Sequence, residues 1–146
     1  MSVRNILDQL QTGTAEDFHY SETIHFVGAG AMASKCNMFR TGNLCYLSLD
    51  PASIPLTSQN QTINSYQLDL PEPMRPLTSK TTNIIANNGT SDFVGSLTLV
   101  KNTVVIPGIL PYQLVISNGP LGGEGFAINA TNVGIPYGAM IIYAAN

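Results

Sequence analysis

The sequence predicts an all-β fold: a jelly-roll-like β-sandwich of roughly eight to ten short antiparallel strands with a short N-terminal helix. Short apolar stretches, several of them alternating with polar residues, recur at spacings of about 8 to 15 residues. Prolines and glycines fall mostly between these stretches, where they favour turns. No repeat of about 20 to 50 residues is present, which argues against a propeller or a solenoid.

The first 20 residues predict a lead-in segment, and residues 21–146 predict the β-sandwich domain. Residues 2–11 can form one short helix with Ile6, Leu7 and Leu10 on one face. Such a helix is unstable alone in water, so we expect it to pack on the domain or to begin a stalk between subunits. The segment lacks the apolar centre of a signal peptide, which predicts synthesis in a cytosol.

The first half of the domain predicts a hairpin followed by a crossover. Strands are expected at 23–27, 32–39 and 44–49, with a turn at 40–43. In the third strand Cys45, Leu47 and Leu49 share one face. Residues 63–70 alternate in the same way. Residues 71–76 hold three prolines, which exclude a helix and a central strand and predict a rigid extended crossover.

The second half predicts further short strands. One begins at 83–86, before a turn at 87–90. The clearest hairpin joins strands 95–100 and 103–106 through Lys101 and Asn102, with Leu97 and Leu99 facing inward. Strands are also expected at 112–117, 126–130 and 138–143, with a glycine-rich flexible loop at 118–125.

Charge is unusually scarce, because only 10% of the residues are Asp, Glu, Lys or Arg, against roughly a quarter in typical domains. An oligomer that covers additional apolar surface explains this composition. Membrane insertion is not expected, since no apolar run approaches the ~20 residues of a spanning helix. A net charge of −3 and scattered basic residues argue against nucleic acid as a partner.

The last predicted strand is apolar on both faces. Ile141 and Tyr143 point to one side, and Met140 and Ile142 point to the other. A strand with one face in water normally alternates apolar and polar residues. We therefore expect one of these faces in the core and the other in an oligomer interface.

Three segments, taken in order, resemble the C-terminal head domains of bacteriophage tail fibres and related viral fibres. They are residues 40–49 (RTGNLCYLSL), 70–76 (LPEPMRP) and 95–106 (GSLTLVKNTVVI). The resemblance covers roughly residues 38–146. It implies a fold similar to the trimeric C1q and tumour-necrosis-factor jelly rolls, and a homotrimer on the virion surface, made in the host cytoplasm. Implied partners are other virion proteins and a host cell-surface glycan or protein. The family usually carries an upstream fibre shaft, whereas this sequence has only about 20 residues before its first predicted strand; two expectations stay open, a free-standing virion protein and a fragment of a longer chain.

Residue roles are predicted on the same basis. Pro71, Arg75 and Pro76 are expected to be structural, because prolines fix the backbone beside Arg75 and its guanidinium can bind carbonyls or an acid. Ligand recognition is expected in loops, where uncharged residues approach a sugar closely. The candidates are Asn118, Gly122, Gly123 and Glu124, with Asn87 and Asn88 as second choice.

Catalysis is not expected, and neither is a cofactor. No nucleophile elbow, phosphate loop or zinc-type spacing is present. His19 and His25, near Glu16, Asp17 and Glu22, form the only acidic–histidine cluster. In an extended strand His19, Thr23 and His25 share a face, so a metal on a trimer axis could take one histidine from each subunit. We expect a solvated polar lead-in to the first strand instead, with His25 as a hydrogen-bonded sheet histidine as the other alternative.

Cys36 and Cys45 are expected to be free core thiols, with a strained cross-strand disulfide as the alternative.

Two alternatives to a receptor-binding head remain open. One is a structural capsid decoration or cap protein that binds no receptor. The other is a non-viral module similar to C1q domains or lectins, which the absence of a signal peptide disfavours.

Overall fold

The computed structural model describes residues 18–27, 32–54, 62–65, 68–104, 107, 111–121, 125–126 and 133–145. Within these ranges the chain forms ten strands, all paired antiparallel, and one short 3-10 helix. The all-β prediction is confirmed. The helix predicted over residues 2–11 lies outside the described residues.

The strands form one continuous sheet in the order β10-β3-β2-β1-β5-β8-β7-β6-β9-β4. Their bounds are β1 (Phe18–Val27), β2 (Met32–Thr41), β3 (Leu44–Leu49), β4 (Ala52–Ile54), β5 (Ile63–Ser65), β6 (Lys80–Asn88), β7 (Asp92–Lys101), β8 (Tyr112–Ser117), β9 (Val133–Ile135) and β10 (Ala139–Ala144); the 3-10 helix is η1 (Glu72–Met74). In this part of the chain no helix is long and apolar enough to cross a membrane.

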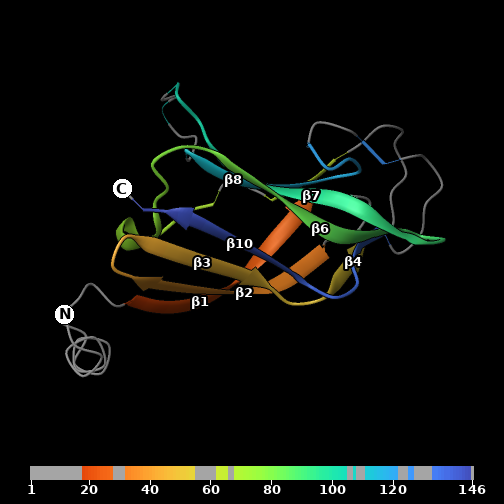
Figure 1. Cartoon of the computed structure of the whole chain (residues 1–146), viewed down its shortest axis with the longest axis horizontal. Helices are drawn as coiled ribbons and strands as arrows, with labels where there is room; N and C mark the ends of the chain where they lie inside the picture. The colour runs from red at the N-terminus through yellow and green to blue at the C-terminus, as the bar shows by residue number, and fades with distance from the viewer. Residues whose placement is uncertain are drawn as a thin grey trace.

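The sheet curls until its ends meet the opposite half. β10 contacts β6 and β7, and β4 contacts β2. Figure 1 shows β1, β2 and β3 on one side of the molecule and β6, β7 and β8 on the other. The space between them is the hydrophobic core, because every second side chain of the long strands points inward.

The core joins side chains from both halves of the curl. β2 and β3 supply Cys36, Met38, Cys45, Leu47 and Leu49, and β7 and β8 supply Leu97, Leu99, Leu114 and Ile116. The predicted shared face of Cys45, Leu47 and Leu49 is therefore confirmed, as is the inward direction of Leu97 and Leu99. Phe93 and Phe126 meet edge to face, with ring centroids 5.9 Å apart.

One predicted hairpin is wrong. Residues 95–100 lie within β7, but the two edges of β7 pair with β6 and β8. Residues 103 and 104 form a bend, and Val104 is 68% exposed; residues 105 and 106 lie outside the described residues. β8 takes the partner position because it brings the fully buried Leu114 and Ile116 into the core.

Other strands differ from prediction in extent. β1 begins at Phe18 and not at residue 23, because its polar residues still pair with β2. Among the described residues of the predicted strand 63–70, β5 covers the first three and Leu68 adds an isolated bridge to Tyr112; residues 66 and 67 lie outside the described ranges. β4 and β9 were not predicted, because three residues are too few for a visible alternation.

The proline crossover is not fully extended. Glu72–Met74 forms one 3-10 turn, closed by the amide of Met74 donating to the Pro71 carbonyl at 2.8 Å. Proline is compatible with the first turn of a helix, where its missing N–H has no partner in any case. The turn brings Met74 into the core as a fully buried side chain.

Candidate functional site

Strand β10 divides its apolar side chains between two environments. Ile141 and Tyr143 are buried, whereas Met140 is 53% exposed and Ile142 is 42% exposed. The Tyr143 hydroxyl donates to the Met74 carbonyl at 2.7 Å. Burial raises the pKa of the Tyr143 phenol, so the hydroxyl stays protonated as a donor. Ile141 and Tyr143 therefore belong to the core, and Met140 and Ile142 face outward.

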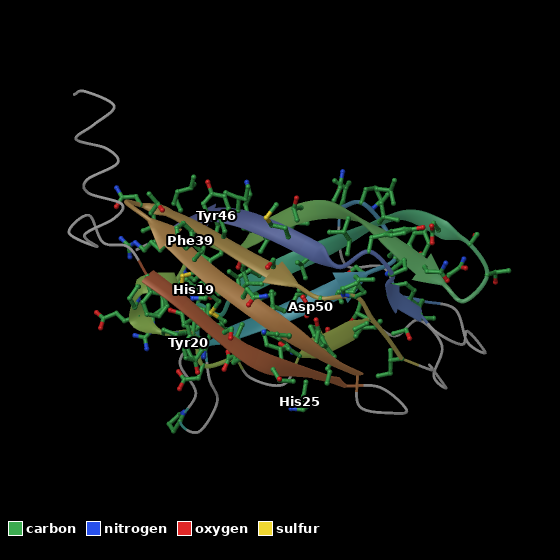
Figure 2. The ribbon with its side chains drawn as sticks, turned by 90° about the horizontal axis from the view of Figure 1, so that it is seen from below. His19, Tyr20, His25, Phe39, Tyr46 and Asp50 are labelled. Atoms are coloured by element: carbon green, nitrogen blue, oxygen red, sulfur yellow. The ribbon has the colours of Figure 1, made fainter. Side chains whose placement is uncertain are left out.

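Outward side chains line up across β10, β3, β2 and β1. Ile142 pairs with Tyr46, Tyr46 with Phe39, and Phe39 with His19. The rings of Phe39 and Tyr46 are 6.1 Å apart between centroids. Figure 2 shows Tyr46, Phe39 and His19 following one another across this side of the sheet.

We call this surface the outer face: the outward side chains of β1, β2, β3 and β10. Its exposed large apolar residues include Phe39, Leu44, Met140 and Ile142. Apart from the histidines, Lys35 is the only charged residue among the described outward positions of these strands. The outer face is therefore apolar mainly on β10, β3 and the end of β2, is polar along β1, and carries almost no charge.

The histidine cluster of the sequence does not come together as a group. His19, Thr23 and His25 do share the outer face, as expected, and all three are exposed. Glu22 points to the opposite side of β1, and Glu16 and Asp17 lie outside the described residues. Among the described residues no group of three or more His, Cys, Asp or Glu side chains is placed to hold a metal ion.

Both cysteines are buried free thiols, as the sequence favoured. Cys36 pairs with Leu49 and Cys45 pairs with Arg40, so the two cysteines do not lie opposite each other. Burial, together with the nearby charge of Glu22, raises the pKa of the Cys36 thiol to about 12. A thiol with such a pKa is a poor nucleophile at neutral pH.

Two arginines hold the proline crossover. The Nε of Arg75 donates to the Leu70 carbonyl at 3.1 Å, within the crossover itself. Arg40, which the sequence did not single out, donates from Nε to the Gly42 carbonyl at 2.6 Å and from a terminal nitrogen to the Pro73 carbonyl at 2.9 Å. Arg40 is only 9% exposed. The sequence placed Arg40 in the predicted turn 40–43, whereas the structure places it in β2 with its side chain inward.

The predicted ligand loops have different outcomes. Asn118 donates from its amide to the Gly125 carbonyl at 3.3 Å, so it braces its own loop. Gly122, Gly123 and Glu124 lie outside the described residues. Asn88 is occupied in its turn, because its Oδ1 accepts from the amides of Thr90 and Ser91, each at 3.0 Å.

Asn87 also stabilises this turn, because its Oδ1 accepts from the amide of Gly89 at 2.7 Å, and it belongs in addition to a polar cluster on the outside of β6 and β7. Its Nδ2 donates to Oδ1 of Asp92 at 2.8 Å, and the hydroxyl of Tyr137 donates to Oδ2 of the same carboxylate at 2.7 Å. The hydrogen bond from Asn87, and to a smaller extent the one from Tyr137, lowers the pKa of the Asp92 carboxyl. We call Asn87, Asp92 and Tyr137 the polar cluster.

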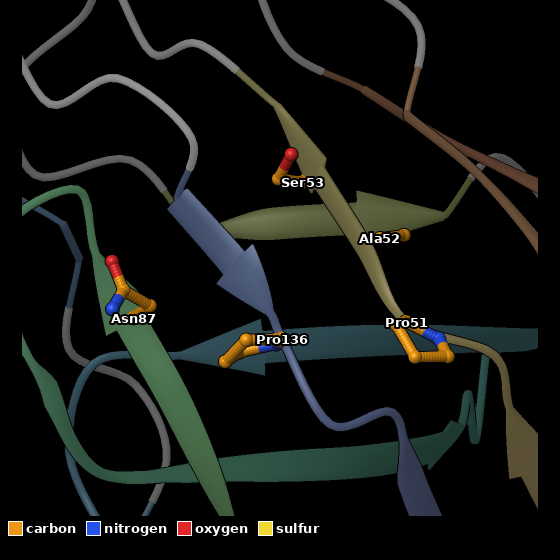
Figure 3. Close-up of a pocket in the computed structure, with 5 residues that line it drawn as sticks. All are labelled: Pro51, Ala52, Ser53, Asn87 and Pro136. Carbon is orange, nitrogen blue, oxygen red and sulfur yellow. The ribbon is translucent and has the colours of Figure 1, made fainter.

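The polar cluster borders an open pocket of about 390 Å³. Its lining comes from β4, β6 and the turn after β9, namely Pro51, Ala52, Ser53, Asn87 and Pro136. Figure 3 shows Pro51 to Ser53 along one strand, with Asn87 and Pro136 across from them. The sequence signalled only Asn87; Asp92 and Tyr137 are brought to it by tertiary structure.

Comparison with known proteins adds no family assignment: no family model matches the chain, and no curated protein matches it.

Proposed function

We propose that the chain is a non-catalytic virion surface protein, similar to the viral fibre heads, that forms a homotrimer and binds a host receptor or glycan. The observation that supports this proposal best is the outer face. Exposed aromatic and aliphatic side chains on the three neighbouring strands β10, β3 and β2, almost without charge, are typical of a surface that another protein covers.

The trimer is proposed from the resemblance to fibre heads, together with the low charge of the whole chain. We further propose that the curled sheet is of the jelly-roll type. The contacts of β10 with β6 and of β4 with β2 support this, because they make two sheet halves enclose one core.

The assembly surface is proposed to include Met140 and Ile142. Burial of an aliphatic side chain of this size stabilises by roughly 1.5 to 3 kcal/mol. In a closed trimer each such residue is buried three times, so a few outward positions can decide whether subunits associate. Ile141 and Tyr143, which the sequence also suggested for the interface, are assigned to the core of one subunit.

The test is light scattering of the purified chain at several concentrations. We expect a trimer for the natural chain and a folded monomer for the double variant Met140→Asp plus Ile142→Asp. Ile141→Asp plus Tyr143→Asp should unfold the chain, because it places carboxylates in the core.

The matched control is Ile85→Asp plus Val94→Asp. These residues form an exposed cross-strand pair on β6 and β7, on the other half of the sheet. This variant should stay trimeric. A natural chain that is monomeric at micromolar concentration, or a control that dissociates as readily as the β10 variant, would contradict the proposed assembly surface.

A further inference from the structure

The polar cluster and the pocket beside it, which share Asn87, combine groups whose chemistry would select a class of ligand. Asp92, Asn87, Gly134 and Ser53 follow one another in register across β7, β6, β9 and β4. A Cβ at Gly134 would overlap the Ala52 carbonyl oxygen, so the glycine lets β4 approach this closely. The row therefore places a carboxylate and an amide side by side, with a hydroxyl two strands farther on, beyond Gly134.

Tyr137 supplies a fixed aromatic surface at the end of this row. Its hydroxyl is held by Asp92 at 2.7 Å, yet the residue is 70% exposed. The hydrogen bond restricts the ring without burying it, so a ligand that stacks on the ring finds it already ordered. Such preorganisation reduces the entropy that binding costs.

The hydrogen-bonding capacity of the cluster is only partly used. Each oxygen of the Asp92 carboxylate accepts one hydrogen bond within the cluster and can accept another. The Asn87 amide has a second N–H, since one of its two donors goes to Asp92. Ser53 is exposed at the far side of the pocket. These groups can bind hydroxyls as acceptors and as donors.

Charge limits the class of ligand. Asp92 is held ionised and would repel a carboxylate, sulfate or phosphate. No lysine or arginine is among the described residues that form the cluster or line the pocket. The walls are otherwise two prolines and an alanine, which contact apolar C–H surfaces. A volume of about 390 Å³ is at the small end of ligand pockets, which suits one or two sugar rings.

We propose that this site binds a neutral saccharide, with a sugar ring stacked on Tyr137 and its hydroxyls bonded to Asp92, Asn87 and Ser53. The inference deepens the receptor-binding part of the proposed function and rests on it. It places recognition on the half of the sheet opposite the outer face, so that trimer assembly and sugar binding use different surfaces.

The test begins with an array of neutral, sialylated and sulfated glycans, followed by calorimetric titration of the best neutral oligosaccharide. We expect neutral glycans to bind. Tyr137→Ala and Asp92→Asn should each weaken that binding by about tenfold or more, the factor that corresponds to 1.4 kcal/mol. Tyr137→Phe keeps the ring but not its anchor and should weaken binding less than Tyr137→Ala.

Tyr20→Ala and Asp69→Asn are matched controls, because both residues are exposed and lie outside the cluster. They should leave the affinity unchanged. The inference is overturned if the natural chain binds no neutral glycan, if only anionic glycans bind, or if the Tyr137 and Asp92 variants bind like the controls.

Light scattering of the same samples separates this result from the assembly proposal. A trimer that binds no neutral glycan rejects the saccharide site alone. A monomer that binds a neutral sugar through Tyr137 rejects the assembly alone.

Discussion

Arg40 and Arg75 both bind backbone carbonyls near the proline crossover, but they do so at different depths. Arg40 is nearly buried and joins the turn after β2 to Pro73, whereas Arg75 is half-buried and bonds within the crossover to Leu70. Removing a buried donor leaves its acceptors unsatisfied, which costs more than the net value of the bond. At the scale of single residues, Arg40 is therefore the stronger tie.

We predict that Arg40→Ala lowers the free energy of unfolding by about 3 kcal/mol and Arg75→Ala by about 1 kcal/mol. Urea denaturation measures both. Arg40→Lys should recover only part of the loss, since an ammonium cannot reproduce the planar fork of the guanidinium. A larger cost for Arg75→Ala would show that the crossover depends on its own internal bond and not on its tie to β2.

Glu22 is the residue from which we expect pH-dependent stability. Burial, and secondarily the charge of Asp69, raises the pKa of its carboxyl, and its Oε1 is buried without a hydrogen-bond partner among the described residues. A raised pKa in the folded state means that ionisation disfavours the fold. The penalty is fully present above the folded pKa and is absent below the unfolded value of about 4.3.

Glu22→Gln should therefore raise the melting temperature at pH 7, and the gain should disappear as the pH falls to about 4. Thermal unfolding followed by circular dichroism across this range measures the effect. Asp69→Asn is the partner variant and should give a smaller gain, because burial is the larger cause of the shift. An equal gain at both pH values would contradict a role for the Glu22 charge.

At the scale of elements, the start of β10 depends on a glycine. Gly138 has a φ of 73°, in the left-handed region, and a Cβ there would overlap the carbonyl oxygen of Leu49. Leu49 is the residue of β3 that pairs with Ala139 at the first position of β10. The close approach at Gly138 thus lets β10 leave the turn and pair with β3 at once.

Gly138→Ala should therefore cost clearly more stability than Gly42→Ala. Gly42 also has a positive φ, 59°, but a Cβ there meets no atom within 4 Å. Its substitution should cost only the conformational penalty of about 1 to 2 kcal/mol. Gly138→Ala adds the displacement of a backbone carbonyl, for a total of about 3 kcal/mol or more. Urea denaturation measures both losses of unfolding free energy. If Gly138→Ala and Gly42→Ala lose similar amounts, the backbone of β3 at Leu49 can move aside at little cost.

Across the whole molecule, each half of the curled sheet carries a distinct row of outward side chains. The strands β10, β3, β2 and β1 present an apolar and aromatic row, whereas β7, β6, β9 and β4 present a polar row. A protein in which only 10% of residues are charged must distribute few polar groups over a large surface. This division supports one surface for assembly and another for a ligand, which the variants of β10 and Tyr137 test separately.

Several features of this protein were readable in the sequence, because they depend on local alternation. The shared face of Cys45, Leu47 and Leu49, the two apolar faces of β10 and the exact span of β8 follow from side chains that point to opposite sides of a strand in turn. The alternation of apolar and polar residues indicates which side chains share one face of a strand. It does not report which face is buried, so the division of β10 into Ile141 and Tyr143 inside and Met140 and Ile142 outside required the tertiary structure.

Partners were decided only by the tertiary structure. β7 pairs with β8 across a connection, and not with the residues that follow it, because long-range burial outweighs proximity in sequence. Arg40 meets Pro73 from 33 residues away, and Tyr137 meets Asp92 from 45 residues away. Of these residues, Asn87 carried a sequence signal, as the first residue of the predicted turn 87–90. From the sequence one could predict an all-β chain, a content of charged residues well below that of typical domains, and a last strand that is apolar on both faces. Which side chains meet could not be predicted, because that depends on how the curled sheet brings distant segments into one core.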